Sequence, residues 1–247
     1  RHLLIGLMLC LSLTWSCRSN VVSAFKKIGW VGIFGAVAFG FSLVFLTMAL
    51  HKSPIADVMF TLAAIPILTA LIAWAALRER IQNVTWIAMI GAAVGVALMV
   101  AGHLTGGSIK GVGLSIGCAV SVSIFAVILR WGRDLNMIPM FAVGSFFAAV
   151  IAAPFSFNGP SLNGENIAIL LFWGGLVSPV YYSLFVIASR HIRAGELMLV
   201  VPLETILAVL LAWLILSEIP STNSLLGGIL VIAAVSGMAI YRIYERR

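Results

Sequence analysis

The sequence predicts an all-α protein, a polytopic membrane helix bundle. Its composition is that of a chain surrounded mainly by lipid: 62% of the residues are hydrophobic, 9% are charged, and the mean hydropathy is +1.14. In a typical soluble domain about a quarter of the residues are charged. Apolar runs of roughly the length of a bilayer-crossing helix fill nearly the whole chain. Helices are expected because a helix satisfies its backbone hydrogen bonds within itself.

About nine apolar runs lie between the charged residues, glycines and prolines that interrupt them. They span residues 2–17, 28–50, 54–77, 85–101, 111–129, 138–154, 167–188, 195–216 and 224–241. Pro54 and Pro139 stand at the start of two runs, where a proline removes no helical hydrogen bond. Ser53 is expected to cap the helix that follows it. The short connections leave no room for a catalytic domain outside the membrane.

The basic residues are distributed unevenly between the two sides of the predicted bundle. In a soluble chain the net charge of +7 would favour a nucleic-acid partner. Here twelve of the fifteen lysines and arginines fall in alternate loops and in the tail, and Arg1, Lys52 and Lys110 fall on the other side. The positive-inside rule therefore predicts a multi-pass protein of the cytoplasmic (inner) membrane with a cytoplasmic C terminus, and no nucleic-acid partner.

The chain contains an internal repeat with an offset of 139 residues. This offset aligns Glu79 with Glu218 and brings an Ala-Trp-x-x-Leu-x-Glu pattern into register in the two halves. Asp57 then aligns with Glu196. The two copies are an odd number of spans apart, so they are expected to cross the membrane in opposite directions. Inverted repeats are typical of secondary transporters, whose substrate site lies near the membrane midplane.

The repeated residues form a pattern of a proline, an apolar Ala-Trp stretch, a glutamate and a Gly-rich helix. The first copy contains Pro66, Leu71-Ile72-Ala73-Trp74-Ala75-Ala76-Leu77-Arg78-Glu79, Gly91 and Gly95. The second copy contains Leu211-Ala212-Trp213-Leu214-Ile215-Leu216-Ser217-Glu218, Gly227 and Gly228. This pattern resembles the EamA-type permeases of the drug/metabolite transporter (DMT) superfamily. The second copy departs from it, because Thr205 stands where the proline is expected and Pro202 lies three residues earlier.

The resemblance implies ten spans in an inverted repeat of two five-helix halves. About nine are present, and the first run looks like the family's second helix, so the first family helix is expected to be missing. Residues 1–103 would form the first, N-terminally incomplete repeat and residues 104–247 the second. The implied function is a secondary transporter that moves a small organic metabolite, amino acid or drug-like solute by alternating access, as an exporter or exchanger.

Glu204 is the acid that falls near the middle of a predicted span. Placing an ionised group there costs on the order of 3 kcal/mol on insertion scales, so the side chain should face a cavity, be paired or be protonated. Its helical neighbours Ala208 and Ala212 leave room on that face. A functional interpretation makes Glu204 a proton-coupling group or a partner for a substrate amine. The alternative is a protonated carboxyl group that holds two helices together.

Asp57 and Glu196, which the repeat aligns, lie in the first turns of their predicted helices. Acids at this position complement the positive end of the helix and contribute about 0.3 to 1 kcal/mol at exposed sites. The functional alternative makes them a pair of gate residues. Asp57 would then continue through Thr61 and toward Thr69 as a polar stripe that contacts substrate or a coupling ion.

Further candidates are hydroxyl groups and prolines within the apolar runs. Tyr181 and Tyr182 place hydroxyls and rings at mid-membrane, where they could line a cavity or pack between helices. Ser42, Ser121 and Ser123 are weaker candidates, because a serine in a membrane helix often bonds its own backbone. Three prolines interrupt spans and either free carbonyl groups toward a cavity or produce ordinary kinks. They are Pro66, Pro179 and Pro202.

The sequence offers no chemistry that would indicate an enzyme. It lacks a phosphate-binding loop, a nucleophile elbow and a dinucleotide fingerprint, and its histidines and cysteines lack metal-ligand spacing. We therefore expect no catalytic residue, metal or cofactor. A membrane enzyme or a non-transporting scaffold remains the alternative. The expected partners are the lipid bilayer, a small solute and a coupling proton. The small-residue face from Gly91 to Gly95 is expected to pack within one chain, which would be a monomer or a weak homodimer.

Overall fold

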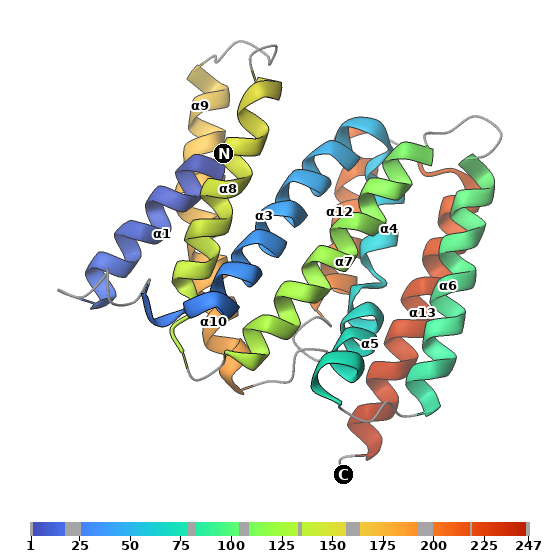
Figure 1. Ribbon diagram of the computed structural model, residues 1–247. Coiled ribbons are helices and arrows are strands. Elements are labelled where there is room, and N and C mark those ends of the chain that lie inside the picture. The colour runs from blue at the N-terminus through green and yellow to red at the C-terminus, as the bar shows by residue number, and fades with distance from the viewer. Residues whose placement is uncertain are drawn as a thin grey trace. The chain divides into compact units, whose positions relative to one another are not determined.

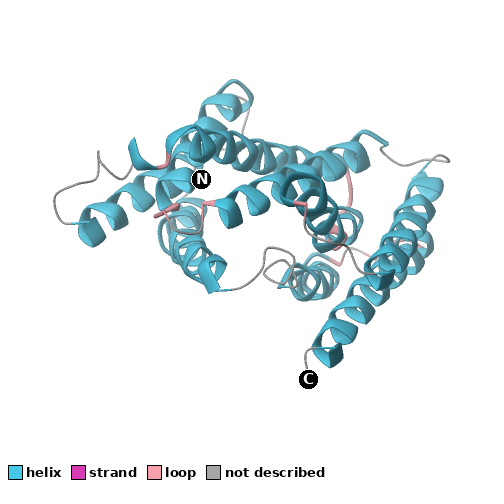
Figure 2. Ribbon diagram, turned by 60° about the horizontal axis from the view of Figure 1, so that its bottom comes forward, coloured by secondary structure: helices cyan, strands magenta, loops and turns pink. Residues whose placement is uncertain are grey.

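The computed structural model describes residues 2–17, 26–78, 83–103, 109–132, 135–156, 164–191, 200–217 and 219–245. Within these ranges the chain forms helices joined by short connections and contains no strand (Figure 2). Five helical segments are long and apolar enough to cross a membrane: Gly29–Lys52, Ile55–Ala76, Ile109–Trp131, Ile167–His191 and Thr222–Tyr241. Shorter apolar helices are His2–Leu11, Asn83–Leu98, Ile138–Pro154 and Glu204–Leu216. The predicted polytopic helix bundle is confirmed.

The helices follow the predicted apolar runs closely (Figure 1). In chain order they are α1 (His2–Cys17), α3 (Gly29–Lys52), α4 (Ile55–Leu62), α5 (Ile65–Leu77), α6 (Asn83–His103), α7 (Ile109–Trp131), α8 (Ile138–Ser156), α9 (Gly164–Leu170), the π-helix η1 (Leu171–Val177), α10 (Ser178–His191), α12 (Val200–Leu216) and α13 (Thr222–Glu245). The run predicted over 195–216 begins in residues outside the described part of the chain.

The chain divides into two compact units, and each unit combines segments from both halves of the sequence. Unit 1 comprises Arg1–Val44 and Phe125–Arg193, and unit 2 comprises Phe45–Ile124 and Ala194–Arg247. The helices α3 and α7 contribute residues to both units. Each unit is described below by itself.

The core of unit 1 is a cluster of aromatic side chains. Phe39 of α3 makes edge-to-face contacts with Phe125, Phe141 and Tyr182, with ring centroids 4.7 to 5.3 Å apart. The Tyr182 ring stacks on Phe141 at 5.1 Å. Small residues let α3 and α8 approach closely, since a Cβ atom on Gly144 would lie 2.5 Å from the carbonyl oxygen of Ala36.

Pro179 accounts for a local change of helix type in unit 1. It has no N–H to donate, so the regular hydrogen-bond pattern cannot continue through it. The preceding residues Leu171–Val177 form the π-helix η1, and both the backbone N–H and the hydroxyl group of Ser178 donate to the carbonyl oxygen of Trp173. This pattern closes the wider turn and joins η1 to α10 without a break.

Unit 2 is built around the antiparallel pair α6 and α13, which lie side by side (Figure 1). A Cβ atom on Gly95 would lie 2.7 Å from the Gly227 carbonyl oxygen, and a Cβ atom on Gly91, one turn earlier, would lie 3.2 Å from the Cβ atom of Ala234. The contact partners therefore run in opposite order along the two helices. The prediction that the Gly91 to Gly95 face packs within one chain is confirmed.

The helices α4 and α5 form one membrane-crossing segment that is broken in the middle. Pro66 lies in the first turn of α5 and cannot donate to the carbonyl oxygen of Leu62, which removes a hydrogen bond of a continuous helix. The chain makes a turn at Ala63 and Ala64 instead, with the Ala64 N–H donating to the Thr61 carbonyl oxygen at 3.3 Å. Pro66 thus separates the span into two helices, a stronger effect than a kink.

The predicted cap at Ser53 is wrong. Pro54, not Ser53, is the residue at the N-cap of α4, and no side chain caps this helix. The Ser53 hydroxyl group is buried and has no hydrogen-bond partner among the residues that the structure describes. The start of α7 packs against it, because a Cβ atom on Gly111 would overlap the Ser53 side chain. Tertiary packing has overridden the local preference of serine for capping.

In unit 2 the helices of the two copies of the internal repeat end and begin at equivalent residues. With the offset of 139, the last residue of α5, Leu77, aligns with the last residue of α12, Leu216. The next residue adopts a left-handed conformation in both copies, with φ of 53° at Arg78 and 55° at Ser217. The first residues of α6 and α13 align as well. The two copies therefore end one helix and begin the next in the same way.

Candidate functional site

Two helices of unit 2 donate hydrogen bonds to the backbone around the break between α4 and α5. The Thr205 hydroxyl group of α12 donates to the Met59 carbonyl oxygen at 3.1 Å. The Ser123 hydroxyl group of α7 lies 3.4 Å from the carbonyl oxygen of Ile65. Both hydroxyl groups also bond their own helices, and both residues are at most 1% exposed. The break is therefore stabilised by polar side chains at a depth where backbone groups need partners.

Asp57 joins the start of α4 to the start of α13. Its side chain is 3% exposed, and its Oδ1 atom accepts a hydrogen bond from the Ser224 hydroxyl group. The Ser224 hydroxyl group also contacts the hydroxyl group of Ser221 at 2.7 Å. Because both helices begin at this point, their positive N-terminal ends face the carboxyl group of Asp57. Asp57 thus lies in a first turn, as predicted, and also fixes a second helix.

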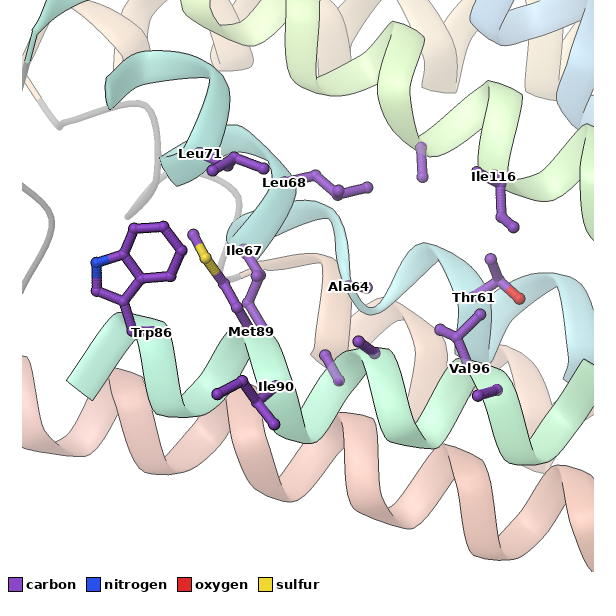
Figure 3. Close-up of a pocket in the computed structure, with 14 residues that line it drawn as sticks. Thr61, Ala64, Ile67, Leu68, Leu71, Trp86, Met89, Ile90, Val96 and Ile116 are labelled. Carbon is purple, nitrogen blue, oxygen red and sulfur yellow. The ribbon is translucent and has the colours of Figure 1, made fainter. Parts of the chain in front are cut away.

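A pocket of about 830 Å³ lies in unit 2 beside the broken helix (Figure 3). Residues of α5, α6 and α7 form most of its lining, which is almost entirely aliphatic apart from Trp86 and Met89. The Trp86 ring meets Trp74 edge to face, with centroids 6.1 Å apart. Ile90, which is 66% exposed, also lines the pocket, so the pocket is open on this side. Its volume is in the range of small-molecule sites.

Thr61 connects the pocket to the Asp57 contact. It lines the pocket from α4, and its hydroxyl group donates to the carbonyl oxygen of Asp57 at 2.8 Å. Figure 3 shows its oxygen turned away from the aliphatic residues of α5. The predicted stripe from Asp57 through Thr61 therefore lies at one end of the pocket. Thr69 is fully buried, does not line the pocket, and finds no hydrogen-bond partner in the described part of the chain.

The acids predicted to act in coupling or gating lie outside this pocket or outside the described residues. Glu204 lies in the second turn of α12 and is exposed, whereas its neighbour Thr205 is buried. Glu204 does not line the pocket. Pro202 is the third described residue of α12, and residues 192–199 before this helix lie outside the described part of the chain. Glu196 falls in the residues 192–199, which the structure does not describe.

The remaining candidates do not line the pocket either. Tyr181 is 40% exposed at the edge of the aromatic cluster of unit 1, and Tyr182 packs within that cluster. Ser42 is buried and donates to the carbonyl oxygen of Phe39 at 2.6 Å, as expected for a serine that bonds its own helix. Ser121 lies on α7 in unit 2 and is nearly buried. Within the described residues, His, Cys, Asp and Glu side chains form no metal-binding group.

The site contains residues that the sequence reasoning did not select. Ser224 is a single serine in an apolar helix, and no local signal separates it from serines that bond only their own backbone. Ser123 was predicted only as a weaker candidate for the same reason. Trp86 was not selected either: it lies in the first turn of α6, and its ring lines the pocket. Thr205 could have been found, because the repeat aligns it with Pro66, the residue that breaks the other copy.

Comparison with known proteins identifies the family. The model of the EamA-like transporter family matches residues 1–101 and 109–240. The chain belongs to this family. It is similar to an uncharacterized transporter of Clostridium kluyveri, with 28% identity over 84% of this chain and 70% of the relative. The chain is also similar to a solved crystal structure of a protein, with a TM-score of 0.67 and 18% sequence identity. The match covers 97% of this chain and 86% of the chain in that structure. That likeness shows the fold.

Family membership decides the broad functional class. The protein is a multi-pass membrane transporter of the DMT superfamily, and its surroundings are the lipid bilayer. The interpretation as a transporter that the sequence favoured over an enzyme or a scaffold agrees with the family and with the name of the relative. A transporter of this family acts on a small molecule, and the pocket beside the broken helix is a site of suitable size in unit 2.

Proposed function

We propose that this protein is a secondary transporter that moves a small organic solute across the cytoplasmic membrane by alternating access, as an exporter or exchanger. The observation that carries the proposal is the broken helix α4–α5 beside the pocket of about 830 Å³. Discontinuous helices are common at substrate sites in secondary transporters, and a break lets the two helix segments adjust their geometry as the site opens. The two EamA-like repeats, residues 1–103 and 104–247, supply the two halves that would rock against each other.

Two acids are proposed to couple solute movement to an ion. Glu204 is an exposed carboxyl group on a helix that is otherwise nearly all apolar, and such groups commonly serve as proton sites in transporters. Asp57 links α4 to α13 through Ser224, and Thr61 links Asp57 to the pocket. A change at the pocket can therefore reach the contact between these helices. Glu196, the repeat equivalent of Asp57, is proposed as a gate residue of the other copy.

The proposal is tested by transport in reconstituted liposomes. Amino acids, nucleosides and cationic drugs are first screened for their effect on the thermal unfolding of the purified protein. Each solute that stabilises the protein is then tested in counterflow, in which labelled solute enters liposomes preloaded with the unlabelled compound. A secondary transporter gives saturable accumulation without ATP. Solutes that bind tightly yet give no counterflow above protein-free liposomes would contradict the proposal.

A further inference from the structure

We propose that the pocket of unit 2 binds an uncharged aromatic solute and rejects the charged forms of the same ring. This inference rests on the proposed function, because it names the class of solute that the transporter would carry. The first argument is the chemistry of the lining, in which Trp86 and Thr61 are the residues with a polar side-chain atom. The Thr61 hydroxyl group already donates to the Asp57 carbonyl oxygen. The nitrogen of Trp86 lies on the side of its ring away from the other labelled residues (Figure 3).

A charged group in this pocket would lose its hydration without gaining a partner from the lining. Removing an ionised group from water without compensation costs several kcal/mol, whereas an apolar ring gains from leaving water. The aliphatic residues Ile67, Leu68 and Leu71 of α5 face the residues of α6 across the pocket (Figure 3). The pocket therefore selects against ammonium and carboxylate groups and accepts apolar surface.

Two residues favour an aromatic ring over an aliphatic chain. Trp86 presents a large ring that is held edge to face by Trp74, so its orientation is set before a ligand arrives. Met89 brings a polarisable sulfur atom to the same end of the pocket (Figure 3). Sulfur contacts with ring edges are favourable, and paired aromatic rings attract each other beyond the gain from burying their area. An acyl chain of a lipid gains neither contribution.

The test uses four compounds that share the indole ring and differ in their ionised groups: indole has none, tryptamine has an ammonium group, indole-3-acetate has a carboxylate, and tryptophan has both. Binding to the purified full chain in lipid nanodiscs is measured by calorimetry. We expect indole to bind and the three charged compounds to bind about tenfold or more weakly, since tenfold corresponds to about 1.4 kcal/mol. Equal or tighter binding of tryptamine, indole-3-acetate or tryptophan would overturn the proposal, as would the absence of binding by indole.

A matched pair of variants locates the binding. Ala93→Trp fills the pocket from α6, and Ala233→Trp places the same side chain on α13 outside the pocket; both positions are exposed, so both variants should fold. Indole binding should be lost in Ala93→Trp and kept in Ala233→Trp. Equal effects of the two variants would overturn the assignment to this pocket. A phospholipid that co-purifies with the protein and is lost only in Ala93→Trp, while indole binding is unchanged, would identify a lipid as the occupant and overturn it as well.

The measurement of indole binding does not depend on transport. The proposal of secondary transport and the proposal of an aromatic solute can therefore fail separately. Counterflow of a charged solute without binding of indole would support the proposal of secondary transport and contradict the proposal of an uncharged aromatic solute. Binding of indole in the pocket, lost in Ala93→Trp, with no counterflow of any solute would support the pocket as an aromatic site and contradict secondary transport.

Discussion

At the scale of single residues, the polar side chains that matter in unit 2 are those that bond across helices. The sequence places Asp57 in a first turn, where the positive helix end favours an acid. It does not reveal the Ser224 hydroxyl group that donates to Asp57, because the two residues are separated by 167 positions. The same holds for Thr205, whose hydroxyl group reaches a carbonyl oxygen 146 positions earlier. Residue type and helix position can be predicted from local sequence, whereas the partner depends on tertiary packing.

Ser224→Ala should lower the free energy of unfolding by about 1 to 2 kcal/mol, because it leaves the buried carboxyl group of Asp57 without this donor. Thermal unfolding of the purified protein in detergent measures the change. Ser236→Ala, on the same helix but partly exposed, is the matched control and should have little effect. Equal destabilisation by the two variants would contradict the prediction. It would show that the hydrogen bond from Ser224 to Asp57 adds nothing measurable to the free energy of unfolding.

Glu204→Gln should abolish the pH dependence of solute uptake in proteoliposomes while leaving folding and insertion intact. The amide keeps the shape of the side chain but cannot bind and release a proton, and the exposed position requires no repacking. Uptake rates at several pH values are compared with those of the unchanged protein. Retention of the original pH dependence in a stable, active variant would remove Glu204 from the coupling mechanism. Reduced stability with unchanged pH dependence would indicate a structural role instead.

At the scale of elements, the helices could be predicted because the bilayer fixes the length of each apolar run. The run 2–17, for example, coincides with α1. Breaks were harder to predict. Pro66 was expected to interrupt its span, yet the extent of the break depends on how Thr205 and Ser123 stabilise the neighbouring carbonyl groups. The π-helix η1 had no signal of its own, since it arises from how the chain accommodates Pro179.

Pro66→Ala should impair transport more than it impairs folding. Alanine restores the N–H group that a continuous helix needs, and it removes the ring that separates α4 from α5, so the broken helix can straighten. Uptake and thermal unfolding are measured for each variant. Pro139→Ala is the control, because Pro139 lies in the first turn of α8 and removes no helical hydrogen bond. Full transport by Pro66→Ala would show that the break is not required.

At the scale of the whole molecule, the internal repeat with its offset of 139 residues accounts for the recurrence of equivalent positions in the two copies. Thr85 and Ser224 are related by the offset of 139, and both side chains are completely buried. The left-handed residues Arg78 and Ser217 are related in the same way. In an experimental structure, residues 54–101 should superpose on residues 193–241 after a rotation of about 180° around an axis in the membrane plane. Segments that cross the bilayer in the same direction would contradict the inverted repeat.

The expected orientation in the membrane follows from the uneven distribution of the basic residues between alternate loops. In unit 1 the Arg190 guanidinium group lies 3.5 Å from the Leu135 carbonyl oxygen, so Arg190, near the end of α10, lies beside the residues that precede α8. In unit 2 the backbone of Lys52 adjoins Gly111, which places Lys52 and Lys110, two of the three residues outside the basic loops, together. This grouping is the pattern from which the positive-inside rule assigns the basic ends to the cytoplasm.

Cysteine labelling in intact cells tests this orientation. The native residues Cys10, Cys17 and Cys118 are first replaced by alanine, and single cysteines are then introduced into the loop from Asn158 to Asn166 or next to Arg133. An impermeant maleimide should label the first position from outside. The second position should label only after the membrane is permeabilised, because the positive charge of its loop holds it in the cytoplasm. The opposite pattern would reverse the assignment of the C terminus and, with it, the direction in which each half of the transporter opens.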